Sequence, residues 1–351
     1  MTPLERLIRE MIMAEGPMRL DRYMGLCLGH PRHGYYMARQ PFGEQGDFVT
    51  APEISQVFGE LLGVWLMSTW VMLGRPSPFN LVELGPGRGT LMADILRAAR
   101  SMPEFLDAAR VHLVETSARL REMQRHTIIG EPTWHASLDT VPEGPLLLVA
   151  NEFFDAIPIR QLECRDGRWR ERVIGIDNDA LRIGLGAPFA EQGRPPRDGQ
   201  IVEIDDQRRH IADAIGQRLA QHPGAALIVD YGHLRSAPGD TLQALRRHTM
   251  VPITEAPGEC DITSHVDFAS LARAIGKGGA QPLPALAQGD FLRAMGLAER
   301  SAALAATASP EAAGQLRRAE ARLADDAGMG KLFKVLAAVS PGVPAPYPFG
   351  P

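Results

Sequence analysis

A glycine-rich turn and an acidic loop contain the residue types in this chain that are best suited to chemistry. The turn spans Glu83 to Thr90 (ELGPGRGT) and follows a short apolar segment. Glycines at such a turn let the backbone approach a ligand closely, and the N-terminus of a following helix offers free N–H groups. The loop spans Asn151 to Asp155 (NEFFD) and also follows an apolar segment. Because two carboxylates and an amide are costly to bury unpaired, we expect this loop to receive a polar or cationic group.

The spacing of the glycines distinguishes two classes of cofactor. A dinucleotide fingerprint has the spacing G-x-G-x-x-G, because its third glycine allows the helix to pack closely beside the pyrophosphate. Here Thr90 stands at that position, and the spacing is G-x-G-x-G. Enzymes that use S-adenosyl-L-methionine have an acidic residue before the turn, as Glu83 is here, which supports the methionine end of the cofactor through an amide or water. We therefore predict S-adenosyl-L-methionine as the cofactor, and an NAD enzyme is the alternative that Thr90 disfavours.

Further positions complete the predicted cofactor site. Gly85 and Gly87 form the turn, and Asn151 is expected next to the transferred methyl group. Glu115 ends the second apolar segment, where its carboxylate can accept hydrogen bonds from both ribose hydroxyls, although it would suit NAD equally well. Leu138 is expected beside the adenine, and an ordinary core position is equally consistent with it. No metal is expected, because the three cysteines are far apart and the histidines are scattered.

These residues need a sheet that brings the ends of its strands to one edge. Short apolar segments predict strands at 79–84, 111–115, 146–150, 225–231 and 331–339, with helices at 55–73, 90–101, 117–126 and 207–221 between them. Wholly apolar strands separated by helices indicate a mostly parallel sheet covered on both faces. The expected fold class is therefore α/β with a Rossmann-like core, and chemistry is expected beyond the carboxyl ends of the strands.

The rest of the chain divides around this core. Residues 1–77 are predicted to form an N-terminal helical segment that covers the core, which occupies residues 78–345. An insertion at about 157–206 is expected to be rich in β structure, because residues 160–176 alternate in polarity around the hairpin signal Asp166-Gly167. Residues 184–200 are expected to be a loop, and residues 235–262 to be irregular.

Four residues are the predicted reaction site: Asn151, Glu152, Asp155 and His265. Carboxylates can hold a guanidinium group bidentately and offset its repulsion from a sulfonium, so Glu152 and Asp155 suit an arginine acceptor. The alternative is a solvent-exposed loop in which Asp155 only caps a helix. Arg208 and Arg209 are interpreted as part of a solvated helix face.

Composition excludes several other functions. The chain has 351 residues and a formal net charge of −5, so no basic surplus indicates nucleic acid. No apolar run is long enough to cross a bilayer. Three isolated cysteines fit a reducing compartment, and the first residues resemble neither a secretory signal nor a transit peptide. We therefore expect a cytoplasmic protein without membrane insertion, and the sequence does not indicate its oligomeric state.

Several motifs together resemble the MidA family of S-adenosylmethionine-dependent methyltransferases, over about residues 4–341. They are GDFVTAPE from Gly46, the glycine turn, NEFFDAIPIRQ from Asn151, VDYG from Val229, DITSHVDF from Asp261, QGDFL from Gln288 and MGKLFKVL from Met329. The resemblance implies a class I methyltransferase fold, with cofactor positions at Glu83, Gly85, Gly87 and Glu115 and a covering segment at 46–53. In mitochondrial members it also implies symmetric dimethylation of an arginine on the complex I subunit that lines the quinone site.

The acceptor is less strongly implied than the activity. We expect a bacterial protein without a mitochondrial presequence, so its protein substrate is expected to be that respiratory complex I subunit or a bacterial counterpart. Two alternatives stay open: a methyltransferase for another protein residue or a small molecule, and a non-catalytic assembly chaperone that retains the fold.

Overall fold

The computed structural model describes residues 1–38, 50–188 and 197–350. The chain forms two compact units, each built from segments that are far apart in sequence. Unit 1 comprises Met1–Phe48, Asp155–Arg208 and Ser236–His265, and unit 2 comprises Val49–Phe154, Arg209–Arg235 and Val266–Pro351. The units divide the chain differently from the expected segments 1–77 and 78–345, and that expected division stays a prediction.

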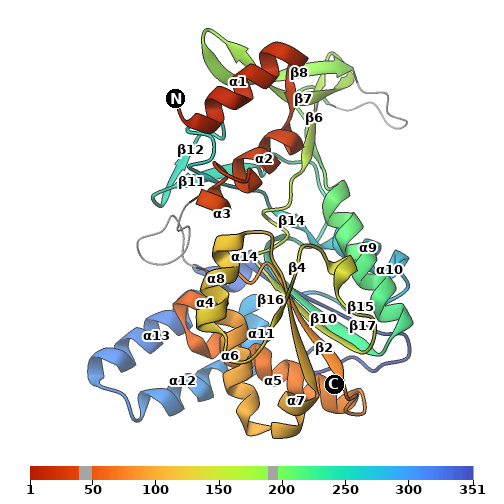
Figure 1. The fold of residues 1–351 in the computed structure, drawn as a ribbon, viewed down its shortest axis with the longest axis vertical. Helices are drawn as coiled ribbons and strands as arrows, with labels where there is room; N and C mark the ends of the chain where they lie inside the picture. The colour runs from red at the N-terminus through yellow and green to blue at the C-terminus, as the bar shows by residue number, and fades with distance from the viewer. Residues whose placement is uncertain (39–49, 189–196, 351) are drawn as a thin grey trace. The chain divides into compact units, whose positions relative to one another are not determined.

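A nine-stranded sheet forms the centre of unit 2 (Figure 1). Its order is β15-β17-β10-β5-β2-β3-β4, and β14 and β16 pair with β10 and β17. The strand bounds are β2 Phe79–Leu84, β3 Ala109–Val114, β4 Thr133–His135, β5 Leu146–Asn151, β10 Gly224–His233, β14 Val266–Asp267, β15 Gln281–Pro282, β16 Leu286–Ala287 and β17 Phe333–Val339. Neighbouring strands from β4 to β10 are parallel, whereas β17 runs antiparallel to β10. The predicted mixed α/β class with a mostly parallel sheet is confirmed.

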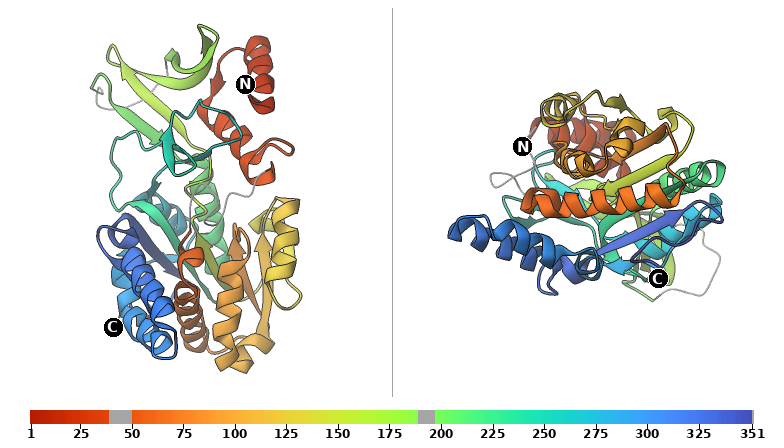
Figure 2. Two further views of the ribbon diagram at one scale, coloured as in Figure 1. Left: turned by 90° about the vertical axis from the view of Figure 1, so that its left-hand side faces the viewer. Right: turned by 90° about the horizontal axis from the view of Figure 1, so that it is seen from below.

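Helices cover both faces of this sheet because successive strand residues point to opposite sides. Leu81, Leu147 and Leu227 belong to one buried apolar cluster, which α5 (Gln56–Met72), α6 (Thr90–Ala98) and α11 (Gln288–Ala294) complete. Val82, Leu148 and Ile228 belong to a second cluster, with α9 (Asp206–Gln221) and α10 (Phe268–Lys277). Helix α12 packs beside α5 (Figure 2). The other helical segments of unit 2 are α4 Ala51–Ile54, η1 Ala99–Ser101, α7 Pro103–Ala108, α8 Ala118–Thr127, η2 Leu138–Thr140, α12 Leu297–Ala305, α13 Pro310–Ala324 and α14 Met329–Leu332.

Unit 1 contains two smaller sheets and three N-terminal helices. Strands β1, β7, β6 and β9 follow one another in the larger sheet, where β8 also pairs with β7, and the smaller sheet has the order β12-β11-β13. The bounds are α1 Pro3–Glu15, β1 Met18–Arg19, α2 Leu20–Gly29, α3 Tyr35–Ala38, β6 Arg160–Arg165, β7 Arg168–Asp177, β8 Ala180–Pro188, β9 Ile201–Ile204, β11 Gln243–Arg246, β12 Thr249–Val251 and β13 Asp261–Thr263. The predicted hairpin at Asp166-Gly167 is confirmed, with both residues at positive φ between β6 and β7.

Two sequence-based expectations in unit 1 are wrong. Residues 184–188 belong to β8 and not to a loop. Their backbone pairs with β7, with Gly184 opposite Val173, and this pairing does not depend on the type of side chain. Residues 189–196 lie outside the described part of the chain. The segment 235–262 contains a hairpin of β11 and β12, whose turn residues Arg247 and His248 have φ of 50° and 60°. Such turns usually hold Asn or Gly, so no turn signal marked this one.

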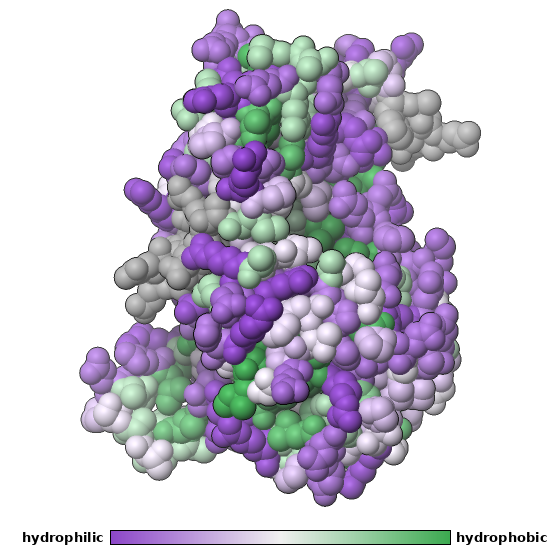
Figure 3. Space-filling view, viewed as in Figure 1, coloured by the Kyte–Doolittle hydropathy of each residue, from purple (hydrophilic) through white to green (hydrophobic). Residues whose placement is uncertain are grey.

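The described helices include none that is long and apolar enough to cross a membrane. On the face shown in Figure 3, hydrophilic side chains cover much of the surface of each unit. Apolar groups are scattered between them, which is usual for a folded chain.

Helices α9 and α10 approach each other closely at glycines, and this generates a stability prediction. A Cβ on Gly216 of α9 would lie 2.2 Å from the carbonyl oxygen of Ile275 in α10. Because backbone atoms cannot move aside easily, we expect Gly216→Ala to lower the free energy of unfolding by about 1–3 kcal/mol. Urea unfolding followed by circular dichroism measures this change.

The control is Gly314→Ala in α13, where a Cβ would meet only the mobile ends of Arg317 and Arg318, at 3.5 Å or more. Alanine favours a helix interior over glycine, so this variant should gain about 0.5–1 kcal/mol. A Gly216→Ala variant as stable as the native chain would contradict the close approach.

Candidate functional site

The glycine turn after β2 adopts a backbone that side chains tolerate poorly. Gly85, Gly87 and Gly89 have φ of 63°, 53° and 85°. A Cβ on Gly85 would also lie 2.7 Å from the ring of Phe153, and one on Gly89 would lie 3.0 Å from Ile128. The turn therefore requires glycine both for its φ angles and for space, and Gly89 is the N-cap residue of α6. This is the cradle of backbone expected beside a bound ligand.

Glu83 lies in β2, two residues before Gly85, and is buried at 2% exposure. The backbone N–H of Met92, in the first turn of α6, faces its carboxylate and favours the ionised form. Its Oε2 atom is buried without a hydrogen-bond partner among the described residues. Burial raises the pKa of Glu83 to about 8, opposed by the backbone N–H of Met92 and assisted by the negative charge of Glu115. A buried acid with an unused oxygen is a site that a cationic or hydrogen-bond-donating group would satisfy.

Glu115 follows β3 and is linked to the glycine turn through one side chain. Its Oε1 accepts the backbone N–H of Ser117 at 2.7 Å, and its Oε2 accepts from Gln124 Nε2 at 3.4 Å. The same Nε2 of Gln124 donates to the carbonyl of Gly87 at 2.7 Å. Burial raises the pKa of Glu115, and the hydrogen bonds from Ser117 and Thr116 oppose this rise. Glu115 and the turn thus lie at the same edge of the sheet.

Leu138 occupies the short helix η2 after β4. Its side chain is buried at 6% exposure in an apolar cluster that includes Val114 and Val141. Its carbonyl accepts a hydrogen bond from Arg218 Nη1 at 2.8 Å. The ordinary core role is therefore present, and the contact with adenine stays a prediction.

Asn151 is the last residue of β5, and Glu152, which follows it, contacts the short helix α4. Glu152 Oε1 accepts from the backbone N–H of Ala51 at 3.0 Å and from Asn151 Nδ2 at 3.2 Å. Glu152 has a φ of 47°, which is an uncommon conformation for a residue with a side chain. Asn151 Oδ1 is buried and lacks a hydrogen-bond partner within the described ranges. It is the second unused buried oxygen at this edge of the sheet.

Helix α4 is also bound to the glycine turn. Glu53 Oε1 accepts from the Thr90 hydroxyl at 2.7 Å, and Glu53 Oε2 lies 3.3 Å from Arg88 Nη1. These contacts belong to the predicted covering segment 46–53. The structure describes this segment from residue 50 onward, and residues 46–49 lie outside the described chain. Its described part contacts both the glycine turn and the loop after β5.

Asp155 and His265 belong to unit 1, whereas the other predicted site residues belong to unit 2. Asp155 is buried at 6% exposure and no helix begins there, so the alternative of a solvated loop with a helix cap is wrong. Its carbonyl accepts the backbone N–H of Ser264 at 3.2 Å, and His265 N–H donates to the Thr241 hydroxyl at 2.9 Å. Unit 1 thus brings the Asp155 and His265 loops together.

The structure gives Arg208 and Asp230 roles that the sequence did not predict. Arg208 is 2% exposed, so its interpretation as part of a solvated face is wrong. Arg208 lies four residues before Ala212 and seven before Ile215, which are both buried. This spacing places Arg208 on the buried face of α9, and it is the signal that could have predicted its burial. Asp230 is fully buried and accepts the backbone N–H of Phe154 at 3.0 Å, so it holds the loop after β5.

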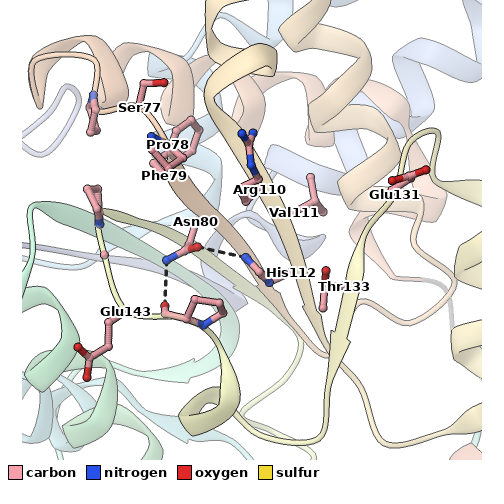
Figure 4. Close-up of a pocket in the computed structure, with 14 residues that line it drawn as sticks. Ser77, Pro78, Phe79, Asn80, Arg110, Val111, His112, Glu131, Thr133 and Glu143 are labelled. Carbon is pink, nitrogen blue, oxygen red and sulfur yellow. Dashed lines mark hydrogen bonds between the residues drawn. The ribbon is translucent and has the colours of Figure 1, made fainter.

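A separate pocket of about 630 Å³ lies at the opposite end of the sheet, lined by the first residues of β2 and β3 (Figure 4). Asn80 donates to the carbonyl of Pro142 at 2.9 Å and lies 3.1 Å from His112 Nε2. Burial lowers the pKa of His112 to about 4, helped by the nearby His135 and Arg218, so the imidazole is neutral near pH 7. This amino-edge pocket includes none of the predicted cofactor residues.

Comparison with known proteins agrees with the geometry of the carboxyl edge. Residues 61–285 match a family of S-adenosyl-L-methionine-dependent methyltransferases. The mitochondrial protein arginine methyltransferase NDUFAF7 of Mus musculus is 37% identical over 96% of this chain and 84% of its own. Its Drosophila melanogaster homologue is 36% identical over 98% of this chain and 86% of its own.

A solved structure agrees with these relatives. A Burkholderia thailandensis protein bound to S-adenosyl-homocysteine superposes with a TM-score of 0.84, at 29% identity, over 98% of this chain and 93% of that chain. The fold, the unused buried oxygens and the glycine cradle suit the same cofactor. The chain belongs to this family of S-adenosyl-L-methionine-dependent methyltransferases, and it is an enzyme of that class.

Proposed function

We propose that this methyltransferase acts on an arginine side chain of a protein. The observation that carries the proposal is the burial of Asp155, the last residue of the loop after β5. A buried acid favours a cationic acceptor, and the planar fork of a guanidinium matches a carboxylate. The names of relatives that match nearly the whole chain support the same acceptor.

The finer classification of the fold is part of this proposal. The strand order of unit 2, with one antiparallel strand beside β10, supports a class I, Rossmann-like core. In open sheets of this kind ligands lie beyond the carboxyl ends of the strands. The glycine turn and Glu115 follow the carboxyl ends of parallel strands, and Asn151 is the last residue of another.

We assign the cofactor to residues of unit 2. Glu83 supports the methionine end, Gly85 and Gly87 give the backbone cradle, Glu115 accepts from the ribose hydroxyls, and Leu138 contacts the adenine. Asn151, whose Oδ1 is unused among the described residues, faces the same edge. The bound cofactor supplies an electrophilic methyl group on a sulfonium.

The acceptor nitrogen needs orientation more than activation by a strong base. Glu152 and Asp155 are assigned to hold the guanidinium and offset its repulsion from the sulfonium. One oxygen of Glu152 already contacts Ala51 and Asn151, so Glu152 also fixes the start of α4. His265 is assigned to the same reaction site. When bound, S-adenosyl-L-methionine would supply the methyl group and leave as S-adenosyl-homocysteine, and the proton lost by the acceptor nitrogen would pass to a carboxylate of this loop or to solvent.

The proposed protein substrate is the complex I subunit that lines the quinone site, or its bacterial counterpart, encountered in the cytoplasm. A methyltransferase for a small molecule or another protein residue is the first alternative, and an assembly chaperone is the second. The residue that receives the label decides between them.

Asp155→Ala should abolish methyl transfer while the affinity for S-adenosyl-L-methionine stays within about three-fold, because this carboxylate is assigned to the acceptor. The measurement is transfer from isotopically labelled S-adenosyl-L-methionine to the proposed subunit, read at arginines by mass spectrometry. Asp155→Asn keeps the shape and should lose about 100-fold or more in rate. Native turnover in either variant would remove Asp155 from the mechanism, and label at another residue type would overturn the arginine proposal.

Cofactor binding should release a proton from Glu83. Because burial holds the pKa of Glu83 at about 8 without a ligand, its carboxyl is mostly protonated at pH 6.5. A cationic group placed nearby favours the ionised form, so affinity should rise with pH until about 8 and then level off. Calorimetric titration with S-adenosyl-L-methionine at pH 6.5, in two buffers of different ionisation enthalpy, measures the release.

The matched control is Glu83→Gln, which keeps an oxygen for the Met92 N–H but cannot ionise. This variant should bind about 10-fold or more weakly. Its binding enthalpy should be the same in both buffers. Equal enthalpies for the native chain would contradict the assignment of Glu83.

A further inference from the structure

Arg208 is a buried cation whose hydrogen bonds converge on two loops of unit 1. Its Nη2 donates to the carbonyl of Asp155 at 3.0 Å and to the Ser264 hydroxyl at 2.6 Å. Its Nη1 donates to the carbonyl of His265 at 2.8 Å, and its Nε donates to the carbonyl of Ile157 at 3.2 Å. The guanidinium thus contacts segments that lie about 100 residues apart in sequence.

The acceptors of Arg208 are mainly backbone carbonyls, and they belong to the residues assigned to the acceptor site or to their neighbours. Asp155 and His265 present their backbone carbonyls to the guanidinium. A direct backbone bond from Ser264 N–H to the Asp155 carbonyl joins the same two loops. Arg208 therefore fixes the backbone from which both side chains extend.

A guanidinium is the side chain that suits this arrangement. It offers five N–H donors in a rigid plane, so one residue can hold several carbonyls at set angles. A lysine ammonium at the same position would keep the charge, but it is a flexible point donor and cannot reproduce the planar set. Because Arg208 is 2% exposed, water does not replace the lost bonds easily.

We propose that Arg208 is a positioning residue for methyl transfer, which holds the Asp155 and His265 loops in the geometry that the acceptor requires. The inference rests on the proposed placement of Asp155 and His265 at the acceptor site. Small errors in the placement of reacting groups reduce rate strongly without changing cofactor affinity. Arg208 itself does not contact the reacting atoms in this assignment.

The test compares Arg208→Lys and Arg208→Met with the native full-length chain. Transfer from labelled S-adenosyl-L-methionine into a protein extract that lacks the native enzyme gives the rate, and calorimetry gives the dissociation constant of S-adenosyl-homocysteine. We expect Arg208→Lys to lose about 100-fold in rate, and Arg208→Met to lose more, while the dissociation constant stays within about three-fold. The matched control is Arg209→Met, since Arg209 is the exposed neighbour in α9 and should keep the native rate.

Hydrogen exchange gives a second readout that does not depend on the acceptor. In Arg208→Lys, amides of residues 155–159 and 262–267 should exchange at least about 10-fold faster, whereas those of 85–92 should not change. Native transfer rates in folded Arg208→Lys, or unchanged exchange in both loops, would overturn the proposal.

Failure of the proposed function is distinguishable from failure of this inference. Label on a residue other than arginine in the native experiment overturns the arginine acceptor. The Arg208 variants are then compared with the native chain on that other acceptor, and the same loss of rate supports the positioning role.

Discussion

The parallel register of β2, β5 and β10 is the constraint on which the rest of the site depends. Leu84 pairs with Ala150, and Val229 pairs with Asn151, so β2 and β5 end at one level beside Val229 and Asp230 of β10. The residues that follow them must therefore emerge together at one edge of the sheet. Without this register the glycine turn, the Asn151 loop and Asp230 would not lie at a common edge.

This edge concentrates polar groups in a place where burial is costly. Glu83, Asn151 and Asp230 are all buried. Both carboxylate oxygens of Asp230 accept hydrogen bonds from backbone N–H groups, those of Phe154 and Tyr231. The unused oxygens of Glu83 and Asn151 raise the free energy of the ligand-free protein. A cofactor with donors at these points would relieve that cost, so the same atoms that destabilise the fold favour binding.

The sequence predicted those features that depend on local pattern. A short, mostly apolar segment before the glycine turn identified β2 at its observed bounds, and the spacing of the glycines indicated the cofactor class. Features set by tertiary contact were not predicted: β8 continues through Gly184 because it pairs with β7, and the turn at Arg247 lacks the usual residues. Arg208 was misread because a charged side chain in a helix is usually solvated, and only the acceptors supplied by distant loops make its burial favourable.

The most direct test of the account is the location of the cofactor, measured by hydrogen exchange with and without S-adenosyl-homocysteine. Amides of the glycine turn at 85–90, and those of residues 51–54 and 135–140, should become protected on binding, because the carboxyl edge of the sheet holds the ligand. Protection confined to the amino-edge pocket around Asn80 and His112, with no change at the glycine turn, would contradict it.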